Sequence, residues 1–176
     1  MDAYLAIVTK REVRAYDQRP IPDDALRAIL EAGRATGSSR NSQPWRFIVV
    51  THRERQRAIG KHCSRPANFE TSAVSIVVAL TDQRLELDSG RAAQNMMVAA
   101  WAMGFGSCPN TPRVDVPHLY EHLGLPEGAS IPTILTLGYP ADGQPRPPRR
   151  ADPKRVLSRI KRLPFERVVS EDRFRE

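Results

Sequence analysis

Cysteines are scarce in this chain and long apolar runs are absent, and each shortage narrows what the protein can be. The 176 residues include two cysteines, Cys63 and Cys108, which lack metal-ligand spacing and are typical of a reduced cytoplasmic protein. Every apolar run is far shorter than the ~20 residues that span a bilayer, so we expect no membrane partner. Residues 1–8 have neither a cationic lead-in nor a long apolar region, which predicts that they are not a secretory signal.

The net charge of +7 could indicate a nucleic-acid partner, but the positions of the charged residues argue against one. Residues 141–176 hold eleven cations and six acids, so this segment alone contributes +5. Aromatic residues make up 6% of the chain and form no cluster here on which bases could stack. A solvated basic tail, partly recruited to a phosphate group, is favoured over a basic nucleic-acid-binding protein, which stays as an alternative.

Helical and strand-like patterns are mixed along the chain, whose length predicts a single domain of residues 1–176. No β-turn-α phosphate fingerprint accompanies them, which favours an α+β sandwich of a sheet and helices over a Rossmann unit. The expected helices begin at Asp2 and at Asp23 or Asp24 and cover 52–62, 88–103 and 115–123; another helix follows the linker 141–153; the strands are 47–50, 74–80 and 131–137; and residues 165–169 are extended.

The longest expected helix, residues 88–103, is almost entirely apolar. Ala92, Met96 and Ala99 share one face with Ala100 and Met103. A helix of this kind must be covered on most sides, so it lies at the centre of the fold or at a subunit interface. We expect this alanine and methionine face to be buried at a symmetric interface.

Two short segments combine cations, hydroxyls and amides. Residues 10–14 contain three cations, and residues 38–47 read Ser-Ser-Arg-Asn-Ser-Gln-Pro-Trp-Arg-Phe. Cations suit a phosphate, while hydroxyls and amides suit a sugar chain or the edge of a ring. Buried amides are costly without partners, so Asn41 and Gln43 also indicate a ligand. Together the segments predict a site for an anionic, planar ligand with polar edges.

Two other patterns are better explained by packing. His118, Glu121 and His122 match the H-x-x-E-H zinc pattern, but a third ligand would have to come from the basic tail, so we expect no metal site. Cys108 follows a helix C-terminus, where the dipole does not favour a thiolate, and no histidine lies in a recognisable partnering motif. We expect its backbone, and not its sulfur, to be useful.

The basic segment and the S-S-x-N-x-Q-P-W-x-F block together resemble the flavin-dependent nitroreductase family. Three further blocks follow in the same order. Residues 88–100 are similar to the central dimer helix, residues 137–140 to the L-G-Y-P strand end, and residues 162–169 to the closing R-x-P-L-E-E-V-V segment. The resemblance implies a nitroreductase-like α+β sandwich, with a central mixed, mostly antiparallel sheet flanked by helices, in an intertwined homodimer. The basic extension 141–176 is then expected to wrap the partner subunit.

The resemblance also implies FMN at the dimer interface, bound by residues of both chains. The basic segment would approach the phosphate and the pyrimidine edge of the ring, and Ser38, Ser39 and Asn41 of the partner subunit would reach the ribityl chain and ring. The loop at 108–111 would lie along the ring and offer backbone groups toward its reactive nitrogen, and two tail cations would complete a phosphate clamp. The expected cofactor-binding residues are Lys10, Arg11, Glu12, Arg14, Ser38, Ser39, Asn41, Cys108, Pro109, Asn110, Thr111, Lys161 and Arg162.

The implied activity is that of a cytoplasmic NAD(P)H-dependent oxidoreductase. By resemblance, NAD(P)H passes a hydride to FMN and leaves, and an electron-poor small molecule such as a nitro compound or quinone then takes its place, a ping-pong mechanism. The flavin supplies the chemistry, so no side chain is expected to be catalytic. Arg14 would support it by stabilising negative charge at the pyrimidine edge.

The chain departs from the family pattern at two residues and in length. Glu12 stands where the family usually has serine, and we expect it to pair with Arg11 or Arg14 and point away from the phosphate. Pro112 cannot donate a hydrogen bond near the ring. The short stretch 104–131 predicts an open, permissive pocket. A protein that uses a deazaflavin or transforms flavin is the alternative enzyme, and a flavin-storage protein is the non-enzymatic one.

Overall fold

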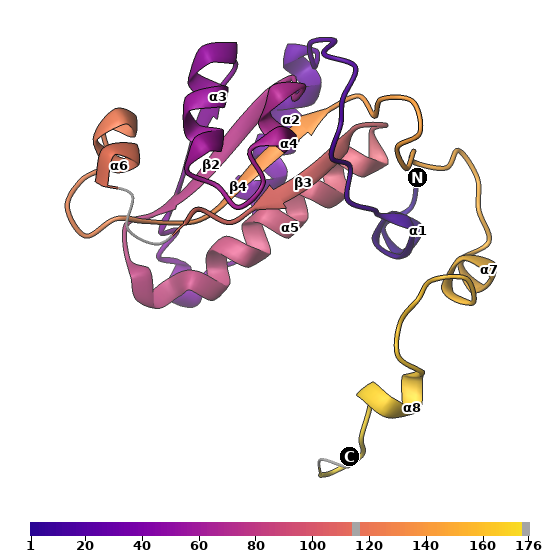
Figure 1. Ribbon diagram of the computed structural model, residues 1–176. Helices are drawn as coiled ribbons and strands as arrows, with labels where there is room; N and C mark the ends of the chain where they lie inside the picture. Colours follow the sequence, from indigo (N-terminus) through magenta and orange to yellow (C-terminus); the bar gives the residue numbers. More distant parts are fainter. Residues whose placement is uncertain (114–116, 174–176) are drawn as a thin grey trace.

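The computed structural model describes residues 1–113 and 117–173, and a four-stranded sheet forms its centre (Figure 1). The strands are β1 (Trp45–Val50), β2 (Val74–Leu80), β3 (Gly106–Asn110) and β4 (Ser130–Gly138), in the order β1-β2-β4-β3. All three pairings are antiparallel, with Val77 opposite Ile134 and Cys108 opposite Thr136. A single parallel bridge joins Glu12 to Ser107. The predicted α+β class is confirmed.

Helices cover both faces of the sheet, which is why β2 is buried along its whole length. Because side chains alternate along a strand, Ile76 and Val78 point into a core with α2 and α5. Val77 points into a second core with Ile59 of α3 and Leu119 of α6. The helices are α1 (Ala3–Thr9), α2 (Asp23–Arg34), α3 (Arg53–Lys61), α4 (Ala67–Glu70), α5 (Glu86–Ala102), α6 (Pro117–Leu123), α7 (Pro153–Leu157) and α8 (Phe165–Val168).

Helix α5 lies at the centre of the subunit, and this corrects the expected position of Met96. Its side chain is fully buried within one chain, so it does not face an interface. Helices α2 and α5 approach closely at Gly33, where a Cβ atom would lie 2.8 Å from Met96 Cγ. Among the described residues, no helix has both the length and the apolar character needed to cross a membrane.

Two segments differ from the sequence expectations, and part of a third cannot be compared with them. Strand β3 was expected to be a loop, because its sequence Gly-Ser-Cys-Pro-Asn has low strand propensity. It is an edge strand, and a proline such as Pro109 is tolerated there because an edge strand pairs on one side only. Residues 165–168 form the short helix α8 in place of the expected extended chain. Helix α6 begins at Pro117, and residues 115–116 of its expected span lie outside the described residues.

The C-terminal tail leaves the body of the subunit after β4. Figure 1 shows α7 near α1, and α8 well away from the sheet. Leu163, Phe165 and Val168 in this tail are 66%, 70% and 63% exposed. Large apolar side chains with so little cover are a feature of interaction surfaces.

Candidate functional site

The basic segment runs in an extended conformation beside β3 and β4. The Val13 N–H donates to the Ser107 carbonyl at 3.0 Å, and Val13 itself is completely buried. Two glycines allow this close approach. A Cβ atom at Gly106 would lie 2.6 Å from the Val13 side chain, and one at Gly138 would lie 2.9 Å from Cβ of Tyr16. The backbone of the site is therefore fixed by contacts that any larger residue would obstruct.

Lys10, Glu12 and Arg14 form one group beside β3. Lys10 Nζ donates to Glu12 Oε1 at 2.5 Å, and the Lys10 side chain is 7% exposed. The expectation that Glu12 pairs with Arg11 or Arg14 is therefore wrong, because Glu12 pairs with the Lys10 ammonium.

Burial raises the pKa of the Cys108 thiol, and the negative charge of Glu12 raises it further. Cys108 is thus held as a neutral thiol, which is unsuited to act as a nucleophile.

Arg11 points away from this group and toward the tail. Its Nη1 donates to the carbonyls of Val8 at 3.0 Å and Lys10 at 2.8 Å. It lines a hollow of 430 Å³ together with Val156, Arg159, Ile160, Lys161 and Arg162. The structure therefore brings together three of the cations predicted to hold a phosphate. Arg159 is a fourth that the sequence reasoning missed, although it lies only three residues before Arg162 in the same basic run.

The segment 108–111 is anchored from behind by buried amides. Asn110 Nδ2 donates to the carbonyls of Cys108 at 3.0 Å and Ile134 at 3.1 Å. Its Oδ1 accepts from Asn68 Nδ2 at 2.7 Å, and both asparagines are almost fully buried. The Asn110 side chain is thus engaged within the subunit and fixes the backbone. The exposed parts of this segment are Pro109 and Thr111.

Asn68 is the second residue that the sequence reasoning missed. It lies in α4 and its Nδ2 is also 3.6 Å from Cys108 Sγ, so it ties this helix to β3. A lone asparagine before a predicted strand carries no distinctive signal, and only the folded chain shows its role.

The serine-rich block lies at the start of α5. The Ser39 N–H donates to Asp88 Oδ2 at 3.0 Å, and Ser38 Oγ accepts from the Gln43 N–H at 2.9 Å. Asn41 and Gln43 are exposed within one chain, which corrects the expectation that their amides are buried. With φ of 55° and 48° they adopt the left-handed backbone, which asparagine tolerates and which is strained for glutamine. Such strain is typical of functional sites.

Within one chain the serine-rich block and the basic segment lie at opposite ends of α5. Asp88 fixes the first near the start of the helix, and Trp101 Nε1 donates to Thr9 Oγ1 at 3.0 Å near its end. Thirteen residues of α-helix separate them, which is about 20 Å at ~1.5 Å per residue. The two blocks are therefore anchored at different parts of α5 within one chain.

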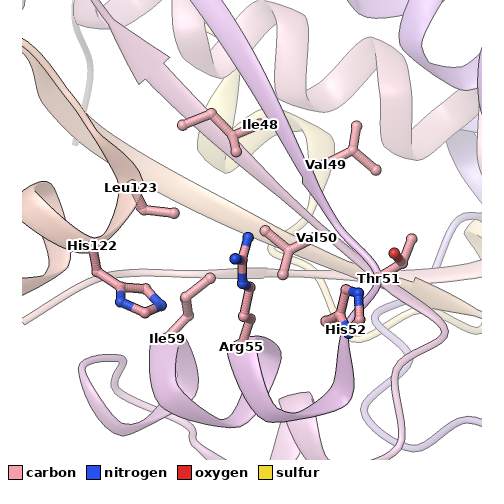
Figure 2. Close-up of a pocket in the computed structure, with 9 residues that line it drawn as sticks. All are labelled: Ile48, Val49, Val50, Thr51, His52, Arg55, Ile59, His122 and Leu123. Atoms are coloured by element: carbon pink, nitrogen blue, oxygen red, sulfur yellow. The ribbon is translucent and has the colours of Figure 1, made fainter.

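A separate hollow of 150 Å³ lies between β1, α3 and α6 and shares no residue with the basic segment (Figure 2). His122 lines it together with Arg55 and His52 above an apolar floor. A guanidinium among the lining groups disfavours a cation. No group of three potential metal ligands occurs in the part of the chain that the structure describes, and the His118 side chain lies outside it.

The fold has counterparts among known proteins. Residues 7–81 and 70–139 match the model of the Nitroreductase family. The NADH dehydrogenase of Thermus thermophilus is 30% identical over 210 aligned residues, covering 96% of this chain and 95% of the relative. Nitroreductase A from Vibrio parahaemolyticus is 27% identical with a TM-score of 0.82, covering 100% of this chain and 78% of that one. The NADPH:FMN oxidoreductase from Vibrio harveyi, solved with NAD+, is 26% identical with a TM-score of 0.81, covering 99% and 79%.

The fold and these relatives together define an oxidoreductase of the nitroreductase type. The chain belongs to the Nitroreductase family. The resemblance noted from the sequence is thereby confirmed, and so is the predicted class of enzyme. The names of these relatives agree with the predicted pair of FMN and NAD(P)H.

The close approach at Gly106 leads to a stability prediction. Gly106→Ala places a methyl group against Val13, and we expect it to destabilise the fold by about 1–3 kcal/mol through overpacking. Gly90→Ala is the matched control, because Gly90 is exposed in α5 with no atom within 4 Å of the added Cβ. It should stabilise the helix by roughly 0.5–1 kcal/mol. Thermal unfolding measures both, and a Gly106→Ala variant as stable as the parent would show that this contact is not tight.

Proposed function

We propose that the protein is a homodimeric FMN oxidoreductase that takes a hydride from NADH or NADPH and delivers it to an electron-poor acceptor by a ping-pong mechanism. The acceptor class is a nitro compound or quinone. One observation supports the proposal best: Arg11, Lys161 and Arg162 line one hollow, beside residues 10–14, whose backbone is hydrogen-bonded to β3. A small-molecule acceptor and a cytoplasmic location complete it.

The donor set suits FMN. Four cations line the hollow at Arg11, and cations with several N–H donors suit a phosphate dianion. Glu12 is neutralised by Lys10, so its charge does not stand alone beside the phosphate, and one reason to prefer a deazaflavin or a flavin-transforming activity is removed. FMN, when bound, would supply the hydride chemistry. The NADPH:FMN oxidoreductase name of the Vibrio harveyi relative supports the same cofactor.

The residues of this chain would bind, orient and provide charge. Arg11, Lys161 and Arg162 would hold the phosphate. Arg14 would place a positive charge at the pyrimidine edge, where negative charge gathers on reduction. The backbone at Pro109 and at Thr111, held from behind by the buried amides, would set the plane of the ring. The neutral Cys108 thiol, buried beside Asn68 Nδ2, would take no part in the reaction.

The first test is spectroscopic. Purified protein supplied with FMN should gain absorbance in the blue region in a ratio of one flavin to each chain, and it should then oxidise NADH or NADPH in the presence of a quinone or nitroaromatic. A protein that gains no such absorbance contradicts the proposal.

The phosphate clamp is tested by comparing two flavins. Arg11→Gln should weaken FMN binding by about tenfold to a hundredfold, since a hydrogen bond to a charged group contributes roughly 1.5–3 kcal/mol. Riboflavin lacks the phosphate, so its affinity should not change. Arg27→Gln, an exposed arginine of α2, is the matched control and should alter neither. Equal losses for both flavins would place Arg11 away from the phosphate.

The proposed dimer interface is the exposed side of α5 together with α1. Ala3 and Ile7 of α1 and Val98, Ala99 and Ala102 of α5 line a mainly apolar hollow of 530 Å³. Ile7 is 56% exposed within one chain, which is unusual for an isoleucine in a stable monomer. Burial of this face against a second copy would bring the two halves of each site together. The tail 141–176, with its uncovered apolar residues, is proposed to wrap that copy.

Ile7→Asp tests this interface without touching the core. A carboxylate placed in an apolar interface costs several kcal/mol, so the variant should be monomeric by light scattering and should lose stoichiometric FMN. Its unfolding temperature as a monomer should be little changed, because the side chain is exposed there. Lys61→Asp on α3 is the control and should stay dimeric. Met96→Asp should instead unfold the subunit. A monomeric Ile7→Asp protein that keeps full FMN would refute the shared site.

A further inference from the structure

Lys10 and Glu12 form an ion pair in which the lysine is buried and the Glu12 side chain is 36% exposed. The Lys10 side chain is 7% exposed, and its Nζ lies 2.5 Å from Glu12 Oε1 and 3.6 Å from Met97 Sδ. A buried ammonium needs a counter-charge, and Glu12 is the one carboxylate within ion-pair distance of it in the described part of the chain. Glu12 therefore neutralises this cation and also holds it in place.

The pair is fixed against the strand that would run along the flavin. The backbone of Glu12 forms a β-bridge with that of Ser107. This bridge places the Glu12 side chain near Cys108, the residue that follows Ser107. Glu12, Arg14 and Lys10 all influence the charge state of the Cys108 thiol. The group around β3 therefore carries two positive charges and one negative charge, and its net charge is set by Glu12.

We propose that Glu12 is a positioning residue that holds the Lys10 ammonium and cancels its charge, so that the bound flavin is harder to reduce than an unpaired lysine would make it. The inference rests on the proposed function. A flavin ring gains negative charge on reduction, so each nearby cation favours the reduced form and each nearby anion opposes it. By lowering the reduction potential, Glu12 makes the reduced flavin a stronger electron donor. The enzyme would then be suited to acceptors that are difficult to reduce.

A double-mutant cycle on the FMN-loaded dimer separates this role from a structural one. Glu12→Gln adds one net positive charge to the group, Lys10→Gln removes one, and the double variant returns to the original net charge. We expect the reduction potential, measured by equilibration with a reference dye, to be highest in Glu12→Gln and lowest in Lys10→Gln. The parent and the double variant should lie together between them. Each single change should alter the ratio of reduced to oxidised affinity by about tenfold, or about 30 mV for a two-electron couple.

Two controls support the cycle. Glu70→Gln breaks the exposed ion pair with Arg57 away from the site and should leave the potential unchanged. Glu12→Ser removes the same charge with a different side chain and should raise the potential as Glu12→Gln does, even if one of the two folds poorly.

The possible results distinguish the inference from the function on which it rests. If the parent protein binds FMN and Glu12→Gln and Glu12→Ser leave its potential unchanged or lower it, the inference is wrong and the proposed function stands. A double variant that shifts as far as Glu12→Gln would also overturn it, because the effect would then not depend on Lys10. If the parent protein binds no FMN, the proposed function fails and the inference falls with it.

Discussion

The close contact between the extended segment 10–16 and strands β3 and β4 is the constraint on which the site depends. It exists because Gly106 and Gly138 carry no side chain where Val13 and Tyr16 lie. Once that backbone is fixed, the side chains on either side of Val13 have little choice of direction. The cations of residues 10–14 are neighbours in the sequence, but their side chains are thereby directed to two different parts of the site.

This division gives the site its electrostatic character. Arg11 joins the tail cations in a hollow that suits a phosphate, while Lys10 and Arg14 stay beside β3 with Glu12 between them in the chain. FMN has a phosphate at one end and, at the other, a ring that gains negative charge on reduction. Each end needs its own source of positive charge. The alternation of an extended strand supplies both from five consecutive residues.

Periodic patterns predicted the covered strands and the long helices, because β2 and α5 have strong apolar patterns that the core then satisfies. Strand β3 could not be predicted in the same way, since its order comes from pairing with β4 and from the buried amides of Asn110 and Asn68. The family resemblance predicted the cofactor-binding residues, and the structure brings the basic segment, β3 and the tail cations near one another. It could not indicate that Glu12 prefers Lys10, which depends on a distance of 2.5 Å between two side-chain atoms. The serine-rich block is the reverse case, because its residues are recognisable in sequence yet lie far from the others within one chain.

The uncovered tail has a consequence for the life of the protein in the cell. A newly made subunit carries Phe165, Val168 and neighbouring arginines on a segment that few contacts protect. Exposed, poorly packed chain ends are the places where proteases cut first. Cleavage before residue 161 would therefore separate the cations at 161 and 162 from Arg11, with which they line one hollow. The phosphate clamp proposed for this chain thus depends on its most exposed segment staying intact.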